Sequence, residues 1–357
     1  MKIKDNALAV LRHEEPERVP WLPDMGVLPT GSLERELRNK GMGLFAGASV
    51  MDVSQPHVKV ERREEGGDIF TTYRTPVGCV STVQTLDYAQ SEEFDRIPWT
   101  KEYMVKNLTD LEVLKFMMED IVYRPNYRPF LEREHWMGDD GIVGTGCDRT
   151  PFHKILLEFT GYKNGIILFQ RYPKEFEDLR VIIEKKQDEA YGILADSPAD
   201  IILMYDNIDA VMISPRLFEK YYIPFYNRQA RLLHKRDKIY ACHMDGRLRC
   251  LSALIGETDL DVINAFTPPP MGDLPISAAE KAWGDKVIWI NFPETVCHYG
   301  VDELKSYTMG LLEECAPGNN VIMGVTETVP FKTIETTFSI ITELLWKHGR
   351  YPLLKVN

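Results

Sequence analysis

From residue 142 onward the chain alternates between short apolar runs and longer segments with helical spacing. In segments such as FEDLRVIIEKKQDEAYGIL the apolar residues recur with the period of an α-helix. Continuous apolar strands separated by helices predict a parallel sheet that is covered on both faces. The runs that we predict to be strands are 142–146, 165–170, 200–205, 238–243, 261–266, 286–291 and 320–325.

An eighth candidate strand, VPWLPDM at 19–25, lies near the start of the chain. Eight parallel strands close a (β/α)8 barrel, and such barrels average about 250 residues before insertions. The rival fold is a doubly wound open sheet, which usually carries a glycine-rich first turn. The nearest candidate here, GTGCDRT after residue 143, does not match GxGxxG. We therefore predict an α/β (β/α)8 TIM barrel, as one domain that spans residues 1–357.

The stretch from about 26 to 140 does not follow this rhythm. It contains a helical piece, SLERELRNKG, and then alternating β-like segments around a Gly-Gly pair at 66–67. Two alternating runs joined by two glycines predict a β-hairpin. We interpret 26–140 as an insertion after the first strand, with 57–90 forming an antiparallel hairpin over the barrel mouth.

Composition narrows the classes of partner. The net charge is −12, and no window combines dense Lys and Arg with aromatic residues, so a nucleic acid is not expected. No apolar stretch approaches the roughly 20 residues that span a bilayer, and no signal peptide is recognisable. Six cysteines are too sparse for a disulfide framework, which favours a cytoplasmic protein. The oligomeric state stays open, with a homodimer as one candidate.

Polar residues follow the predicted strands at the end where barrel enzymes place their chemistry. Asp, Asn and Thr are also favoured as helix N-caps, and that plainer interpretation applies to any single one of them. We predict that Asp24, Tyr205 and Asp206 are catalytic. We predict that Asn207, Thr267, Asn291 and Glu294 bind substrate.

His243 ends an apolar strand, and Asp245 follows two residues later. Together with Glu327 after the last strand, they form a plausible set of ligands for a divalent metal ion. A different class of mechanism needs no metal, with His243 and Asp245 acting as an acid/base pair. Cys242 points opposite to His243 in an extended strand and is expected in the core. Cys297 is the thiol that could replace Asp245 as a ligand.

Three segments resemble the uroporphyrinogen decarboxylase superfamily. They are the long span HMDGRLRCLSALIGETDLDVINAFTPPPMGDLPISAAEKAWGDKVIWINFPETV, the segment MISPRLFEKYYIPFYN and the turn YRTPVG. The resemblance extends from about residue 15 to 350, and within the superfamily it is closest to the corrinoid-dependent methyltransferases. It implies a (β/α)8 barrel, in agreement with the strand count.

The superfamily holds two activities that the residues can separate. The decarboxylase neutralises a tetrapyrrole with many carboxylates through an arginine-rich stretch after its first strand. Here that stretch reads RVPWLPDMGVLPTG, with a single arginine, so a decarboxylase-like lyase is the alternative that we disfavour. The methyltransferases bind zinc through His-x-Cys and a later cysteine. By this resemblance His243 matches the first ligand, whereas Asp245 and Glu327 stand where the family has cysteines.

Carboxylates in place of thiolates make a harder metal centre, which suits polarisation of an oxygen atom by a Lewis acid. We therefore expect transfer of a methyl group from a small methylated substrate, such as a methoxylated compound, to a corrinoid. An N- or S-methyl compound is the open alternative as substrate. No cobalamin-binding motif is visible, so the corrinoid would be carried by a separate partner protein. The expected cofactors are zinc in this chain and cobalamin on that partner.

Overall fold

The computed structural model describes residues 1–86, 98–316 and 320–353. Its contacts divide the chain into two compact units. Unit 1 comprises Met1–Val50, Tyr127–Cys147 and Leu194–Asn357, and unit 2 comprises Met51–Asn126 and Asp148–Ile193. The chain therefore passes between the units four times. Whether they form the single domain predicted above stays a prediction, and each is described by itself.

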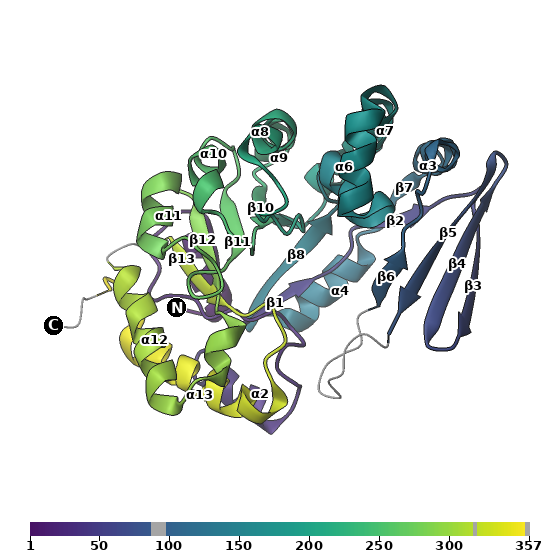
Figure 1. Cartoon of the computed structure of the whole chain (residues 1–357). Helices are drawn as coiled ribbons and strands as arrows, with labels where there is room; N and C mark the ends of the chain where they lie inside the picture. The colour runs from purple at the N-terminus through teal and green to yellow at the C-terminus, as the bar shows by residue number, and fades with distance from the viewer. Residues whose placement is uncertain (87–97, 317–319, 354–357) are drawn as a thin grey trace. The chain divides into compact units, whose positions relative to one another are not determined.

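Unit 1 is built on a curled parallel sheet of seven strands (Figure 1). The strands follow one another along the sheet in sequence order, without the reversal that marks a doubly wound fold. This order agrees with a TIM-like barrel. The strands, in their order across the sheet, are β1 (Leu44–Gly47), β8 (Gly141–Cys147), β9 (Ile201–Met204), β10 (Ile239–His243), β11 (Val262–Phe266), β12 (Val287–Asn291) and β13 (Val321–Gly324).

The two edge strands are bridged by residues 20–25 rather than by an eighth regular strand. The backbone N–H of Leu22 donates to Met323 of β13 over 2.8 Å, and that of Phe45 in β1 donates to Pro23 over 3.0 Å. Isolated parallel bridges join this segment to both neighbours. Pro20 and Pro23 have no N–H to donate, which keeps the segment from forming a continuous ladder. The prediction of eight regular strands in a closed barrel is therefore wrong in its count.

Six of the predicted strands are confirmed as β8 to β13. The run 165–170 is wrong, because it lies in helix α6 (Tyr162–Arg171), where Gly165 and Leu168 are buried one turn apart. Strand β1 was missed, because four residues within the supposed insertion give too short a pattern to recognise.

The core of unit 1 fills the inside of the curled sheet. It takes alternate residues of the strands, among them Leu203 of β9, Ala241 of β10 and Trp289 of β12. Helix α1 (Ile3–Leu11) adds Ala7 and Val10 to this cluster. Arg12 at its end pairs with Asp200, just before β9, so α1 lies at the amino ends of the strands.

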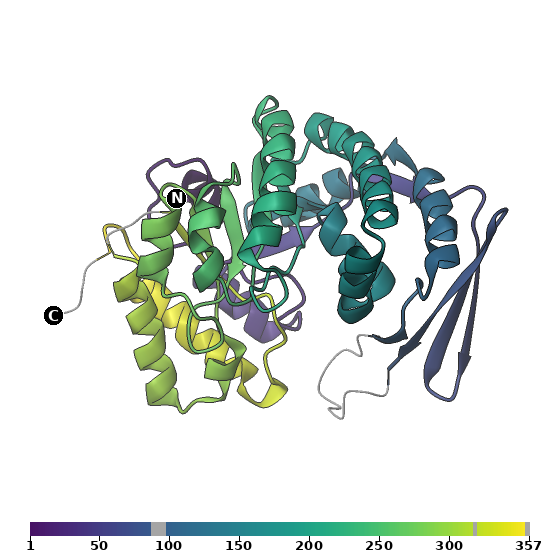
Figure 2. The same cartoon turned by 45° about the horizontal axis from the view of Figure 1, so that its top comes forward.

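Helices cover the outer side of the sheet, and α10 to α13 pack successively against one another (Figure 2). In the described part of the chain, no helix is long and apolar enough to cross a membrane. The helices that lie wholly in unit 1 are α1, α2 (Ser32–Asn39), α4 (Arg128–Met137), α8 (Pro215–Leu217), α9 (Ile223–His234), α10 (Ser252–Gly256), α11 (Ile276–Trp283), α12 (Val301–Glu314) and α13 (Phe331–His348).

Unit 2 contains a four-stranded antiparallel meander, in the order β3-β4-β5-β6, and a two-stranded pair of β2 with β7. The predicted hairpin is confirmed as β3 and β4, joined at Gly66–Gly67, where both glycines have positive φ angles of 60° and 81°. Residues 87–90 of that prediction lie outside the described residues, and its position over the barrel mouth stays a prediction. The elements of unit 2 are β2 (Met51–Ser54), β3 (Lys59–Glu65), β4 (Asp68–Thr75), β5 (Gly78–Thr85), β6 (Trp99–Glu102), α3 (Leu108–Glu119), β7 (Val122–Pro125), α5 (Pro151–Lys154), α6 and α7 (Pro173–Asp196), which ends in unit 1.

Candidate functional site

A polar layer lies above the apolar core of unit 1, at the carboxyl ends of the strands. Side chains alternate along a strand, so the residue two positions beyond a core residue faces the same side. By this rule Tyr205 follows Leu203, His243 follows Ala241 and Asn291 follows Trp289. Asp24 likewise follows Leu22. Four of the predicted site residues are therefore brought to the same inner face.

The loops that follow β9 and β10 hold Asn207 and Asp245 beside each other. The backbone N–H of Asn207 donates to the carbonyl of His243 over 2.9 Å, and that of Gly246 donates to Ile208 over 3.1 Å. A Cβ atom at Gly246 would lie 2.4 Å from the Cβ of Asp209, so the close approach of the loops requires glycine there. Asn207 has a positive φ of 52°, which asparagine tolerates. Its amide Nδ2 donates to Asp245 Oδ2 over 3.3 Å.

Asn291 plays the same part for Glu327. Its Nδ2 donates to Glu327 Oε1 over 3.3 Å and to Thr267 Oγ1 over 3.2 Å. Its Oδ1 accepts from the backbone N–H of Thr326 over 3.0 Å. Because Asn291 is fully buried, it fixes the start of the loop after β13, and with it the Glu327 carboxylate. Thr267 is also buried, and its hydroxyl accepts the hydrogen bond from the amide of Asn291.

His243 lies beside the Asp245 carboxylate and contacts a buried amide on its other side. Its Nε2 is 3.6 Å from Asp245 Oδ2, and its Nδ1 is 3.1 Å from Oδ1 of Asn264 in β11. Asn264 is a residue that the sequence reasoning missed. Its signal was present, because an amide within the otherwise apolar strand 261–266 has to find a partner when buried.

Burial and charge shift the acidities in this layer. Burial raises the pKa of Asp24 to about 6, although the charge of nearby His243 opposes the shift. Burial also raises the pKa of Tyr205 to about 12, with Asp24 contributing, so its hydroxyl stays protonated at neutral pH. Burial, and then the negative charge of Asp245, raises the pKa of Glu327. For Asp245, burial acts to raise the pKa, but the interactions with neighbouring His243, and then with the amide of Asn207, outweigh it and leave the pKa lowered.

Two predicted residues lie apart from this cluster. Asp206 is fully buried on the outer side of β9 and accepts a hydrogen bond from the hydroxyl of Tyr226 in α9 over 2.6 Å. Glu294 lies in a 3-10 turn, Glu294–His298, where it pairs with His298 over 2.8 Å. Its charge nevertheless raises the pKa of Glu327, so it stands at the edge of the site.

The cysteines take separate places. Cys242 is fully buried and its Sγ contacts the hydroxyl of Tyr226 over 3.7 Å, as its outward register requires. Cys297 is buried in the 3-10 turn, where burial raises its pKa to about 12 and favours the neutral thiol over a metal-binding thiolate.

The types of donor atom in this layer suit a metal ion, but the side chains are not close enough together to hold one. Across the described residues, no three His, Cys, Asp or Glu side chains converge closely enough to hold a metal. The donors themselves are suitable, since an imidazole nitrogen faces one carboxylate while a second carboxylate feels the charge of the first. Ligation by His243, Asp245 and Glu327 stays a prediction, as do the catalytic and substrate-binding roles assigned above.

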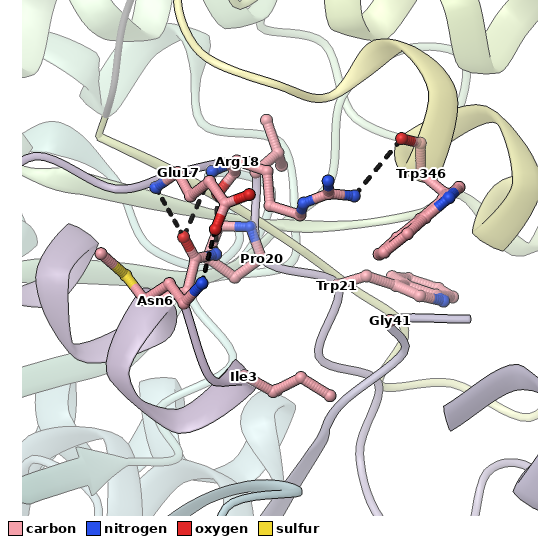
Figure 3. A pocket seen from close by; sticks show the side chains of 10 residues that line it. Ile3, Asn6, Glu17, Arg18, Pro20, Trp21, Gly41 and Trp346 are labelled. Atoms are coloured by element: carbon pink, nitrogen blue, oxygen red, sulfur yellow. Dashed lines mark hydrogen bonds and ion pairs between the residues drawn. The ribbon is translucent and has the colours of Figure 1, made fainter. Parts of the chain in front are cut away.

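A cavity of about 220 Å³ lies at the opposite, amino-terminal end of the strands (Figure 3). Its polar groups pair with one another. Asn6 donates to the carbonyl of Arg18 over 2.8 Å and accepts from the backbone N–H of Glu17 over 2.8 Å, while the Arg18 guanidinium lies 4.0 Å from the centre of the Trp346 ring. Groups that satisfy one another in this way anchor α1 to the segment that follows it, which is typical of the stabilising face of a barrel.

No protein-family model and no curated protein matches the chain. Among solved structures, a methyltransferase from Methanosarcina mazei is similar over 97% of this chain and 99% of its own, with a TM-score of 0.59 and 13% identity. The two proteins share a fold. At this identity the likeness speaks for the architecture alone. A protein described as a vitamin-B12-independent methionine synthase, from Listeria monocytogenes, gives a TM-score of 0.37 at 12% identity, over 66% of this chain and 68% of its own.

Proposed function

We propose that the chain is a methyltransferase that moves a methyl group from a small methylated compound to the cobalt of a corrinoid on a partner protein. Methoxylated compounds are the first candidates for the methyl donor. The observation that carries the proposal is the pair of His243 and Asp245 after β10, whose Nε2 and Oδ2 atoms are 3.6 Å apart, with Glu327 after β13 near enough for the charge of Asp245 to raise its pKa. The fold shared with a methyltransferase supports it.

The three residues would hold a divalent cation, for which zinc is the first candidate. Such an ion supplies Lewis-acid polarisation of the oxygen that leaves the methyl group. Asn207 and Asn291 orient the two carboxylates through their amide N–H groups. When the bond between methyl carbon and oxygen breaks, its electron pair stays on the oxygen, which then takes up a proton. Asp24 is suited to deliver that proton, because a pKa of about 6 leaves part of it protonated near neutral pH.

The charge of the site bears on the class of substrate. Asp24, Asp245, Glu294 and Glu327 place four carboxylates at one end of the sheet. An acidic site repels anions, so a neutral or cationic methylated compound fits it better than a porphyrinogen with many carboxylates. The lyase alternative is disfavoured on this ground also.

Glu327→Gln tests the proposal, because it keeps the shape of the side chain and removes the charge. We expect bound zinc, measured by elemental analysis, to fall well below that of the parent protein. Methyl transfer from methoxylated aromatics to cobalt(I) cobalamin, followed by absorbance, should be lost with it. Asp285→Asn, which removes an exposed carboxylate before β12, serves as the control and should change neither quantity. Full zinc binding and full transfer by Glu327→Gln would contradict the assignment.

A second function has its own supporting observation. The raised pKa of Asp24, beside His243, is what a general acid needs, so the site could also act as a metal-free acid/base centre. Treatment with a chelator separates the two functions. Activity that survives complete removal of metal supports the acid/base site, and activity that returns only with zinc supports the methyltransferase.

A further inference from the structure

Asn264 is buried in a way that does not serve stability. Its side chain is 1% exposed, near the end of β11, and its Nδ2 has no hydrogen-bond partner. A buried amide that leaves a hydrogen bond unmade destabilises the fold. An apolar side chain of the same size would avoid this cost, so the amide calls for another explanation.

The backbone around Asn264 is also irregular. The pairing of β11 with β12 shifts register between Ile263 and Phe266, and Ala265 has a positive φ of 56°. Such a bulge re-aims the side chains beside it, and a positive φ at alanine is strained. The strained bulge adjoins Asn264, whose side chain contacts His243.

The contact fixes where the proton of His243 lies. Oδ1 of Asn264 is 3.1 Å from Nδ1 of His243, and an amide oxygen can only accept a hydrogen bond. Nδ1 must therefore carry the proton, and the neutral ring then has its free electron pair on Nε2. That nitrogen faces Oδ2 of Asp245 at 3.6 Å. When the ring is neutral, Nε2 and the Asp245 carboxylate are two electron-pair donors with no hydrogen between them, and such a pair attracts a cation.

We propose that Asn264 is a positioning residue that holds His243 in the Nδ1–H tautomer and so directs the unprotonated Nε2 toward Asp245. The assignment of the tautomer stands on geometry alone. Its consequence, a ring nitrogen prepared to bind a metal ion, rests on the proposed function. Outer partners of this kind fix the ring orientation of metal-binding histidines in general.

The tautomer is measured directly by NMR, without metal or substrate. Protein with 15N-labelled histidine is dialysed against a chelator, and long-range 1H–15N spectra are recorded at a pH where the ring is neutral. The chain has eight histidines, and the signals of His243 are those that disappear in His243→Gln. We expect the pattern of a protonated Nδ1 and an unprotonated Nε2. A protonated Nε2 in the parent protein would overturn the proposal.

Two substitutions separate positioning from packing. Asn264→Leu keeps the volume but removes the acceptor, so we expect His243 to move its proton to Nε2 and donate to Asp245. Zinc affinity should then fall about 10- to 100-fold, the usual cost of losing an outer partner. Asn264→Asp keeps an acceptor oxygen and should keep the Nδ1–H pattern. Thr145→Val, at a buried side chain on β8 whose hydroxyl has no hydrogen-bond partner within the described residues, is the matched control and should leave the tautomer unchanged.

The outcomes distinguish the two proposals. An unchanged tautomer in folded Asn264→Leu would overturn the role of Asn264. If that variant does not fold, loss of the Nδ1–H pattern in Asn264→Asp would overturn it instead. The Nδ1–H tautomer in a protein that binds no zinc would uphold Asn264 and contradict the proposed metal site.

Discussion

Two aspartates at strand ends show what decides the role of a single residue. Asp24 and Asp206 both follow apolar runs, and both were predicted to be catalytic. The register places Asp24 on the inner face near His243, whereas Asp206 points outward to the hydroxyl of Tyr226. Residues 201–204, IILM, are apolar at every position, so their sequence holds no alternation that tells the inner from the outer face. The position of each aspartate at the end of a strand was predictable from the sequence, but the face of the sheet on which its side chain lies was not.

The raised pKa of Asp24 predicts a pH-dependent effect on stability. The folded pKa of about 6 lies above the ordinary value of 3.8, so the protonated form stabilises the fold at low pH. That contribution is complete below about pH 4 and is lost as the pH rises through 6. Asp24→Asn should therefore gain stability relative to the parent between pH 4 and 7, by roughly 1–3 kcal/mol.

The measurement is urea unfolding of both proteins at several pH values, with a chelator present throughout. Asp285→Asn, at an exposed carboxylate, should show no such trend. A difference between Asp24→Asn and the parent that does not vary with pH would mean that Asp24 ionises like an exposed group.

At the scale of elements, the sequence predicted those strands and turns that have a clear periodic pattern or a characteristic turn residue. Strands β8 to β13 were recognisable as apolar runs between helices, and the β3–β4 hairpin by its two glycines. The run 165–170 misled, because a short apolar segment suits a buried helix as well as a strand. The segment 20–25 lies where an eighth strand would lie. Its two prolines interrupt the hydrogen bonds to β1 and β13, so it does not form a regular strand.

Asn6 attaches helix α1 to residues 17 and 18, just before that segment. Asn6 is 5% exposed and makes three hydrogen bonds to the backbone of Glu17 and Arg18. Asn6→Leu leaves three backbone groups without partners and should lower the free energy of unfolding by about 2–4 kcal/mol. Denaturant titration measures this loss.

Asn6→Asp is the matched comparison, because it keeps the two acceptor contacts and loses only the donor to Arg18. Its loss should be clearly smaller. Equal losses in the two variants would show that the volume of the side chain, and not its hydrogen bonds, holds α1 in place.

At the scale of the whole molecule, the sequence predicted one barrel with an insertion, and the contacts give two units that share four chain crossings. Such crossings join residues far apart in sequence, so no local pattern reveals them.

The edge of the meander in unit 2 is also a feature at the scale of the whole molecule, because an open sheet edge can pair with another copy of the chain. In the described part of that sheet β3 and β6 are the two edge strands, and all seven residues of β3 are exposed.

Charged side chains keep such an edge from pairing with another copy. Arg62 and Glu64 on β3 pair with each other over 3.0 Å, so replacing both with valine leaves the net charge of −12 unchanged. We expect the double variant to associate as its concentration rises, which light scattering after size-exclusion chromatography detects. The same double replacement with glutamine keeps the edge polar and should behave like the parent. Equal masses for the two variants at every concentration would show that these charges do not guard the edge.

The packing of α1 and Trp289 beneath the polar layer has a kinetic consequence. Apolar side chains fill the inside of the sheet below Asp24 and His243, so within the described residues the polar layer is approached from the carboxyl ends of the strands. A ligand that binds against this apolar layer is covered by any ligand that binds after it, so the first to bind is the last to leave. In the proposed reaction, a methyl donor bound against this apolar layer would have to arrive before the acceptor that covers it. Steady-state kinetics would then follow a compulsory order, with the demethylated product released only after the acceptor has departed.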